Sequence, residues 1–409
     1  MKFVILSFAT IGDALREWFG LDVQIPIQTY GFFVAIAFIT GAFIMSHEYK
    51  RKENEGLIGP IYKVFTVGEK ATTADLIKTF LIAFVIGYKF VAIIFNYSEF
   101  ANNAQDFLMS GRGSWAGGII VGLASAFYTF YDKNKKKLPT PKKLILRIYP
   151  HQMAGNILIV TGIFGLLGAK IFHNLENWDR FVADPIGELF SFSGLTFFGG
   201  LIVGGFAGWW YLKKNNLSSF HTLDCAAAGL PFAYAMGRVG CQCSGDGCWG
   251  IENTSEAPSW IPDWAWSSQF PHNVINAGEK IADCNGSHCH ILSHGVYPTS
   301  LYETLMMLVI FAIIFFGLNK KIKLPGMIFG IYLTLQGIER MLIEQIRVNN
   351  KFHLFGMEVT QAEIIATCLI ISGITVTFLC WKFKDKIAKI TKYKEEIPDI
   401  KAEIVDKID

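Results

Sequence analysis

Long apolar stretches recur along the chain and alternate with short polar segments. A helix needs about 20 mostly apolar residues to cross the hydrocarbon core of a bilayer. Nine stretches approach this length and predict transmembrane helices, with boundaries good to a few residues: 30–46, 77–97, 114–131, 151–172, 196–212, 221–240, 299–318, 325–345 and 360–381. The apolar run near the N-terminus is too short for a signal peptide, so we interpret residues 1–29 as an interfacial segment.

Lysine and arginine are distributed unevenly between the two sets of connecting segments. If the N-terminus lies outside, the inner segments hold 25 of the 37 Lys and Arg residues, the outer segments hold 7, and 5 lie within the predicted helices. Because positive residues gather on the inner side of membrane proteins, this split predicts an outer N-terminus and an inner C-terminus.

The composition agrees with a membrane protein. Hydrophobic residues make up 52% of the chain and charged residues 17%, whereas soluble domains average about 25% charged residues. These values exclude a disordered chain, a collagen and a small disulfide scaffold. The net charge of +3 gives no electrostatic support for a nucleic-acid partner. We therefore predict an all-α polytopic membrane protein that contacts membrane lipid.

Two pairs of predicted helices resemble each other in sequence. In each pair, an apolar helix with a Gly-x-Lys motif is followed by a Gly-rich apolar helix: 80–100 and 113–137 in the first, 160–178 and 193–216 in the second. We infer that 77–131 is an extra helix pair that repeats 151–212 in the same orientation. The alternative is that Gly-rich membrane helices resemble one another by composition alone.

Several charged residues lie within the apolar stretches, where each costs about 2.5–3.5 kcal/mol. Arg238 lies near the outer end of the sixth helix, in a run that contains two glycines. On the eighth helix, Arg340, Glu344 and Arg347 are spaced at i, i+4 and i+7 and share one face. Polar residues of three other helices are predicted at the same depth, in the outer half of the bilayer: Tyr30, Lys170, His173, Tyr302 and Glu303.

These arginines indicate a site for an anionic lipid head group. The guanidinium fork favours a bidentate phosphate or carboxylate partner, and two such groups lie at the level of the outer leaflet. Two alternatives stay open. Arg340 and Glu344 can form a purely structural ion pair, and Arg238 can extend to the outer interface without binding a ligand.

Five short motifs follow one another along the chain: Tyr30-Gly31, Ser193-Gly194-Leu195-Thr196-Phe197-Phe198-Gly199-Gly200, Gly237-Arg238-Val239-Gly240, Pro298-Thr299-Ser300-Leu301-Tyr302-Glu303 and Arg340-x3-Glu344-x2-Arg347. In content and order they resemble the prolipoprotein diacylglyceryl transferase family, over almost the whole chain except about 77–131. Members of that family usually have seven spanning helices, which equals nine minus the extra pair.

The resemblance divides the chain into seven parts. They are an outer interfacial segment (1–29), helix 1 with an inner loop (30–76), the extra helix pair (77–131), family-like helices (132–240), a periplasmic head loop (241–298), the last three helices (299–381) and a cytoplasmic tail (382–409). The expected fold is therefore seven family-like helices plus an inserted, duplicated pair, N-out and C-in, with a small outer head domain.

The resemblance implies a multi-pass transferase of the bacterial inner (plasma) membrane, with its active site toward the periplasmic side and no cofactor. The implied reaction moves the diacylglyceryl group of phosphatidylglycerol to the lipobox cysteine of a prolipoprotein signal peptide. It forms a thioether and releases glycerol phosphate, and it requires no metal. The implied catalytic residues are Arg238, Arg340, Glu344 and Tyr30. The implied substrate-binding residues are Arg238, Arg340, Asp246, Tyr302, Arg347, Gly199 and Gly200.

Some positions depart from the family pattern. Many members carry a histidine, proposed as the base, where this chain has Phe198, which cannot take a proton. The usual Asn and Glu that follow the signature arginine are Cys241 and Asp246 here, and a common Tyr before the helix-8 arginine is Gln336.

The identity of the proton acceptor is therefore open. The substrate thiol needs a base or a positive field to raise its thiolate fraction. We expect either that the arginines alone activate the thiol or that a neighbour takes its proton, with His173 and Glu344 as the candidates.

Five of the eight cysteines fall at or in the outer segment: Cys241, Cys243, Cys248, Cys284 and Cys289. That compartment permits disulfides, so we expect one or two, with at least one thiol left over because five is odd. The alternative is a zinc site in the run Cys284–His290 with His294 nearby, although the spacing is not that of a standard finger.

Two other function classes remain open from the sequence. One is an anionic-lipid-binding transporter or flippase, which should carry polar residues through the full depth of its helix bundle. The inner halves of the later helices are almost purely apolar, which argues against such a path. The other is a catalytically inactive family member, suggested by Phe198 and Cys241.

Overall fold

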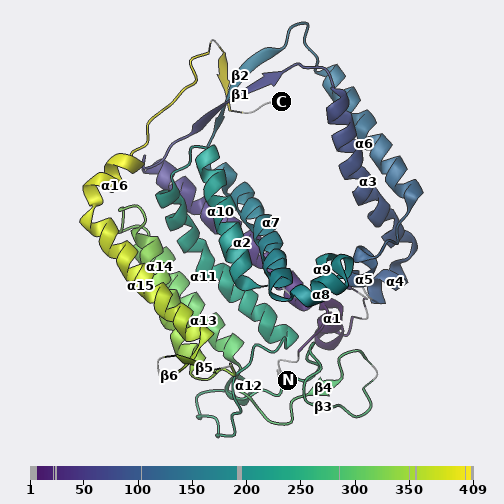
Figure 1. Cartoon of the computed structure of the whole chain (residues 1–409), viewed down its shortest axis with the longest axis vertical. Helices are drawn as coiled ribbons and strands as arrows, with labels where there is room; N and C mark the ends of the chain where they lie inside the picture. The colour runs from purple at the N-terminus through teal and green to yellow at the C-terminus, as the bar shows by residue number, and fades with distance from the viewer. Residues whose placement is uncertain are drawn as a thin grey trace. The chain divides into compact units, whose positions relative to one another are not determined.

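The computed structural model is mostly helical and divides into two compact units (Figure 1). It describes residues 7–21, 23, 25–102, 104–190, 196–284, 286–349, 351–354, 357–400 and 402–406. The first unit comprises Met1–Ile58, Pro150–Leu158 and Asn216–Tyr393. The second comprises Gly59–Tyr149, Ile159–Asn215 and Lys394–Asp409.

The first unit is a helical bundle with short strands in its connecting segments. Its elements are α1 (Ile11–Phe19), α2 (Thr29–Asn54), α11 (Ser219–Ser244), α12 (Asp263–Trp266), β3 (Glu279–Lys280), β4 (His290–Ile291), α13 (Thr299–Ala312), the π-helical η1 (Ile313–Leu318), α14 (Met327–Glu344), β5 (Lys351–Leu354), β6 (Met357–Thr360), α15 (Gln361–Lys382) and α16 (Lys384–Thr391). Helix α11 packs against α2 and α13, and α14 packs against α15.

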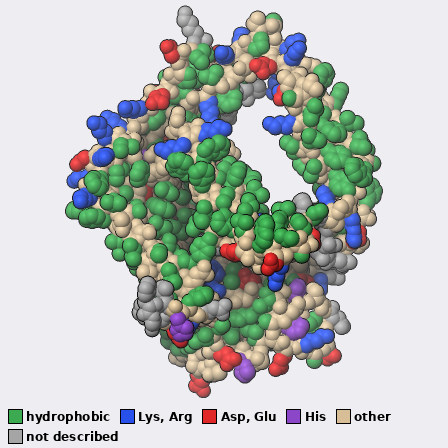
Figure 2. Space-filling model, viewed as in Figure 1, with side chains coloured by type: hydrophobic (Ala, Val, Ile, Leu, Met, Phe, Trp, Pro, Cys, Tyr) green, Lys and Arg blue, Asp and Glu red, His purple; other side chains and the backbone are tan. Residues whose placement is uncertain are grey.

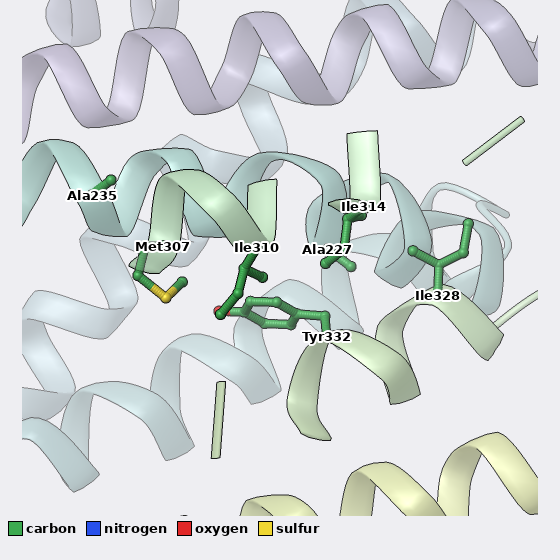
Figure 3. Packing of buried hydrophobic residues seen from close by; sticks show 7 residues of the cluster. All are labelled: Ala227, Ala235, Met307, Ile310, Ile314, Ile328 and Tyr332. Carbon is green, nitrogen blue, oxygen red and sulfur yellow. The ribbon is translucent and has the colours of Figure 1, made fainter. Parts of the chain in front are cut away.

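The core of this unit lies where α11, α13, η1 and α14 meet (Figure 3). Its buried members are Ala227, Ala235, Met307, Ile310, Ile314, Ile328 and Tyr332. The alanines of α11 leave room for the larger side chains of the facing helices, which is the close packing that membrane helices favour.

The second unit contains two helical hairpins and a small sheet. Its elements are β1 (Ile61–Val67), α3 (Thr73–Phe95), α4 (Tyr97–Asn102), α5 (Ala104–Met109), α6 (Trp115–Lys135), β2 (Lys142–Ile148), α7 (Pro150–Glu176, which begins in the first unit), α8 (Trp178–Ala183), α9 (Pro185–Phe190), α10 (Phe197–Lys214) and β7 (Glu403–Val405). The sheet order is β1-β2-β7, with β1 antiparallel and β7 parallel to β2.

Several elements of the second unit recur at a spacing of 81 positions, and the second long helix recurs at 82 positions, since α6 begins at Trp115 and α10 at Phe197. Strand β2 begins at Lys142 and β1 at Ile61, and helices α8 and α9 begin 81 positions after α4 and α5. In the β1–β2 ladder, Val64 pairs with Ile145, which is its own counterpart 81 positions later. Residues before Val64 pair with residues after Ile145, and residues after Val64 pair with residues before Ile145. The two copies of the strand therefore pair symmetrically about the Val64–Ile145 pair.

The packing of the two hairpins is also equivalent. A Cβ built on Gly87 of α3 would lie 2.8 Å from the carbonyl oxygen of Gly117 on α6. A Cβ built on Gly168 of α7 would lie 2.4 Å from the carbonyl oxygen of Gly199 on α10. Both helix pairs thus approach closely at glycines that lie at matching positions of the two repeats.

Each of the nine predicted membrane segments lies in a helix of the structure, or in α13 together with η1. Among the described residues, five helices are long and apolar enough to cross a membrane: α2, α3, α7, α13 with η1, and α15. Figure 2 shows hydrophobic side chains over the visible faces of α3 and α6, where Leu81, Val85, Ile120 and Phe127 are exposed. The count of nine spanning helices and their orientation stay predictions.

The prediction of an all-α chain is only coarsely right, because short strands occur between the helices. Residues 61–67 and 142–148 fall in predicted inner loops, yet they form a seven-residue antiparallel ladder. Their pairing joins segments far apart in the sequence, which an apolar pattern cannot reveal. In the tail after residue 382, helix α16 and strand β7 are present.

We expect Gly199→Val to destabilise the protein by about 1–3 kcal/mol through overpacking. A Cβ there would lie 2.4 Å from the Gly168 carbonyl oxygen and from the Phe172 Cβ. The matched control is Gly205→Val on the same helix, where a Cβ meets nothing within 4 Å. Thermal unfolding in detergent measures both variants, and equal unfolding temperatures would contradict the packing role of Gly199.

Candidate functional site

The site begins at Arg238, which lies on α11 near the end of that helix. Its Nε lies 2.6 Å from Oε2 of Glu303, and its Nη2 donates to the Tyr234 hydroxyl at 2.8 Å. Tyr234 lies one turn earlier on α11 and itself donates to Glu303 Oε2 at 2.7 Å. Glu303, on α13, is fully buried. Helix packing therefore holds the guanidinium against a carboxylate that has no access to water.

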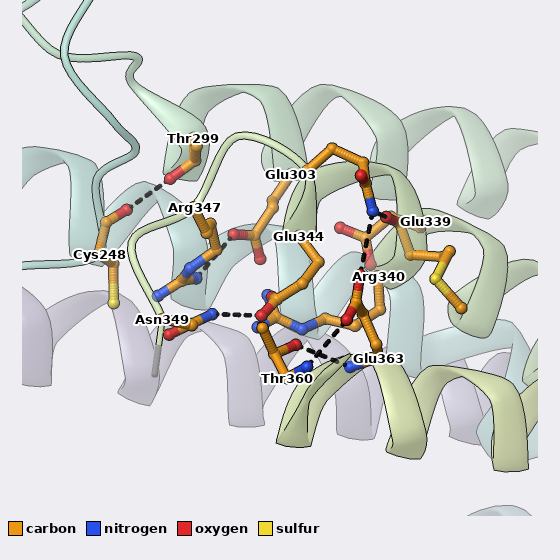
Figure 4. Close-up of polar contacts among 12 residues, drawn as sticks. Cys248, Thr299, Glu303, Glu339, Arg340, Glu344, Arg347, Asn349, Thr360 and Glu363 are labelled. Carbon is orange, nitrogen blue, oxygen red and sulfur yellow. Dashed lines mark hydrogen bonds and ion pairs between the residues drawn. The ribbon is translucent and has the colours of Figure 1, made fainter. Parts of the chain in front are cut away.

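Glu303 binds a second arginine with its other oxygen. Nη1 of Arg347, in the segment after α14, lies 3.1 Å from Glu303 Oε1 (Figure 4). The Nε atom of Arg347 is buried and has no hydrogen-bond partner among the described residues. Buried donors are rarely left without an acceptor, so this atom indicates an acceptor group that is yet to bind.

A second ion pair lies on α14. Arg340 Nη2 is 2.7 Å from Glu344 Oε2, and Asn349 Nδ2 donates to Glu344 Oε1 at 2.6 Å (Figure 4). Both Glu344 oxygens are therefore engaged, which leaves this carboxylate poorly suited to take a proton from a substrate. Nη1 of Arg340 is buried without a partner in the part of the chain that the structure describes. Two arginines thus each offer one unused donor.

Three further residues predicted at the site lie in the same unit. Tyr30 stands at the start of α2 beside α11, where its Cδ2 would be 3.4 Å from a Cβ on Gly240. Asp246 accepts a hydrogen bond from the Cys248 backbone N–H at 3.1 Å. Tyr302 donates its hydroxyl proton to the carbonyl oxygen of Ala265, so it ties α13 to the loop that follows α11.

His173, Gly199 and Gly200 belong to the second unit. His173 lies in the last turn of α7, where Asn177 donates to its carbonyl oxygen. Gly199 and Gly200 lie on α10 and face α7 closely. Their predicted roles in proton transfer and substrate binding stay predictions. Ser193, Gly194 and Leu195 of the glycine-rich motif lie outside the described residues.

The sequence interpretation missed one acidic residue of the site, Glu339. It is 2% exposed, its Oε2 accepts a hydrogen bond from Gln336, and its Oε1 has no partner among the described residues. The signal was present in the sequence, since Glu339 is an acidic residue inside the predicted eighth helix. It does not stand out there, because it directly precedes Arg340 and lies off the face shared by Arg340, Glu344 and Arg347.

The loop after α11 is tied to the helices that carry the arginines. Thr299 Oγ1 donates to the Cys248 carbonyl oxygen at 2.8 Å (Figure 4). The Ile251 N–H donates to the carbonyl oxygen of Ile346, directly before Arg347. These bonds hold the loop against the start of α13 and the end of α14.

Among the described residues, one disulfide is present in the loop that follows α11, between Cys284 and Cys289. This confirms the expected disulfide and the leftover thiols, since Cys241, Cys243 and Cys248 are free. The zinc alternative at Cys284–His290 is wrong in this structure, because both of its cysteines are bonded to each other. Elsewhere in the described chain, one group has metal-ligand proximity: Cys241, Asp246 and Cys248.

Known proteins resemble the part of the chain that carries the arginines. The family model described as prolipoprotein diacylglyceryl transferase matches residues 142–379, more than half of the chain. A phosphatidylglycerol–prolipoprotein diacylglyceryl transferase of Vibrio campbellii is 31% identical over 250 residues, which cover 58% of this chain and 77% of that protein. A transferase of the same name from Corynebacterium diphtheriae is 28% identical over 221 residues, 53% of this chain and 74% of that protein.

The relatives share one name and activity. A third transferase of that name, from Clostridioides difficile, is 29% identical over 238 residues, 57% of this chain and 81% of that protein. These relatives are enzymes by name, so the transporter alternative is not favoured. The five apolar helices indicate a multi-pass membrane protein. The chain belongs to the prolipoprotein diacylglyceryl transferase family.

Proposed function

We propose that this protein transfers the diacylglyceryl group of phosphatidylglycerol to the thiol of a prolipoprotein lipobox cysteine. The observation that carries the proposal is the pair of unused, buried guanidinium donors, on Arg340 and Arg347, beside the Arg238–Glu303 ion pair. Such donors suit the phosphate of an anionic lipid. The reaction forms a thioether and releases glycerol phosphate.

The arginines act mainly on the leaving group. Cleavage of the carbon–oxygen bond turns a phosphate diester into a monoester with additional negative charge. Fixed guanidinium groups in a site sheltered from water stabilise that charge without reorganising. Arg238 and Arg340 supply this stabilisation, Glu303 orients Arg238 and Arg347, and Glu344 with Asn349 orients Arg340.

The remaining predicted residues have supporting roles. Tyr30 and Asp246 order the network around Arg238, and Tyr302 fixes the outer loop over α13. Gly199 and Gly200, which lie on α10, stay candidates for lipid binding. His173 stays a candidate proton acceptor, and Glu344 is a weaker one because both of its oxygens already accept hydrogen bonds.

We further propose that the chain spans the inner membrane nine times, N-out and C-in, with the site toward the periplasm. The disulfide in the 241–298 segment supports an oxidising compartment on that side. The 81-residue spacing and the matching glycine contacts support a duplication of the segment that precedes residue 142. The family match begins at residue 142, as expected if the preceding copy is the insertion.

A transfer assay tests the function. Purified protein is mixed with phosphatidylglycerol and a synthetic lipobox peptide, and the peptide is weighed by mass spectrometry. We expect a mass gain of one diacylglyceryl unit, and no gain for a control peptide in which serine replaces the cysteine. A folded sample that binds phosphatidylglycerol without modifying the peptide would contradict the enzyme and leave a binding protein.

A further inference from the structure

Three of the described glutamates are buried at the end of the first unit that holds the arginines: Glu303, Glu339 and Glu344. Glu303 and Glu344 each bind an arginine, at 2.6 and 2.7 Å, and their second carboxylate oxygens are also engaged. In Glu339, Oε2 accepts from the neutral amide of Gln336, and Oε1 is buried without a partner among the described residues. Of these three carboxylates, Glu339 is therefore the one that keeps an oxygen for an incoming donor.

Two other side chains of α14 fix the orientation of this carboxylate. Gln336 Nε2 donates to Glu339 Oε2 at 3.1 Å, and the Tyr332 hydroxyl donates to Gln336 Oε1 at 3.2 Å. The spacings of three and four residues make these side chains neighbours on the helix surface. Tyr332 is itself anchored in the buried core of the unit. The free oxygen of Glu339 is thus held in place before any ligand arrives.

Packing places Glu339 with the arginines. It directly precedes Arg340, whose Nη1 is a buried donor without a partner among the described residues. Tyr234, which binds Arg238, packs against the core cluster that contains Tyr332. Figure 4 shows Glu339 in the same group of side chains as Arg340. A free buried acceptor and unused guanidinium donors therefore lie in one region of the unit.

A buried acceptor without a partner indicates that the ligand brings a donor. The phosphate of the proposed lipid substrate offers acceptor oxygens, which suit the arginines. The lipobox thiol is the complementary group, because its S–H must give up a proton before the sulfur can attack. A carboxylate sheltered from water and bound by a neutral amide takes up a proton more readily than one paired with arginine. Glu339 has this property, whereas Glu303 and Glu344 are paired with arginines.

We propose that Oε1 of Glu339 accepts the proton of the lipobox thiol and so acts as the catalytic base. The inference rests on the proposed function, which supplies the thiol. The S–H bond breaks and its proton moves to Oε1, while the electron pair of the sulfur forms the bond to the glyceryl carbon of phosphatidylglycerol. The bond from that carbon to the phosphate oxygen breaks, and its electron pair leaves with glycerol phosphate. The proton then passes from Glu339 to water, which restores the carboxylate.

This proton transfer also keeps the total charge of the site constant. Glu339 loses its negative charge when it takes the proton, and the leaving phosphate gains one as the diester becomes a monoester. The site therefore never holds the Glu339 carboxylate and the second phosphate charge at the same time. Holding both would be costly in a region sheltered from water.

A lipobox peptide with selenocysteine in place of cysteine separates proton transfer from a structural role. A selenol is largely ionised at neutral pH, so it needs no base. We expect Glu339→Gln, which keeps the size of the side chain, to lower transfer to the cysteine peptide by about 10²-fold or more. With the selenocysteine peptide, the same variant should react within about tenfold of the wild-type rate. Arg238→Ala should stay slow with both peptides, because the leaving group is the same.

The matched control is Glu358→Gln, which removes an exposed glutamate of β6 that pairs with Lys351 and should change neither rate. Thermal unfolding in detergent verifies that each variant is folded. Equal losses with both peptides would overturn the inference and leave Glu339 as a positioning residue for Arg340 or a ligand of the lipid head group. Full activity of Glu339→Gln with the cysteine peptide would also overturn it. A folded wild type that modifies neither peptide would instead refute the proposed function.

Discussion

Replacing Arg238 with alanine is expected to reduce diacylglyceryl transfer by about 10²–10³-fold or more, the usual effect of removing one electrostatic donor from a preorganised site. Arg238 is the group on α11 that contacts both Tyr234 and Glu303. Without it, Arg347 is the one charged partner that Glu303 keeps among the residues that the structure describes. Arg238→Lys keeps the positive charge and loses the planar fork, so we expect it to recover only part of the rate.

Initial rates with phosphatidylglycerol and lipobox peptide measure this effect, and thermal unfolding in detergent separates it from a loss of folding. The control is Arg112→Ala, an exposed arginine of the second unit that pairs with Glu99. It should leave the rate within a factor of two. A folded Arg238→Ala protein that keeps a tenth or more of the wild-type rate would show that this arginine does not stabilise the leaving group.

The largest loss of stability is expected for Asp224→Ala, at about 3–5 kcal/mol, because it breaks a buried ion pair by removing one partner. Asp224 accepts a hydrogen bond from the Lys52 ammonium at 3.1 Å, and both residues are less than 5% exposed. It also accepts the backbone N–H groups of Gly326 and Phe329 at the start of α14. The substitution leaves a buried ammonium and two helix-terminal donors without their acceptor.

Chemical denaturation in detergent measures the effect. Lys52→Met combined with Asp224→Leu should recover part of the loss, because no unpaired charge stays buried. The matched control is Asp132→Asn, which breaks an exposed pair with Lys136 and should unfold close to the wild type. If Asp224→Ala unfolds like that control, the buried pair contributes little.

Much of the site was predictable, but the ion pairs between different elements were not. Arg238, Arg340, Glu344 and Arg347 stand out in sequence because charge inside an apolar stretch needs a reason. The sequence could not reveal that Glu303 bridges Arg238 and Arg347, which come from different elements and lie far apart along the chain. The i, i+4 pair of Arg340 and Glu344 was predictable, since helical spacing alone brings it together.

By itself, the sequence determined the helices, the membrane class and the family. Those properties depend on local patterns, because an apolar run of sufficient length must form a helix wherever it meets lipid. Only the tertiary structure decided that β1 pairs with β2, that Glu339 is buried beside the arginines, and that Cys241 meets Cys248 across a turn. These arrangements depend on which helices pack together and how the loops close between them. That is settled by the sum of many distant contacts and leaves no periodic signal in the chain.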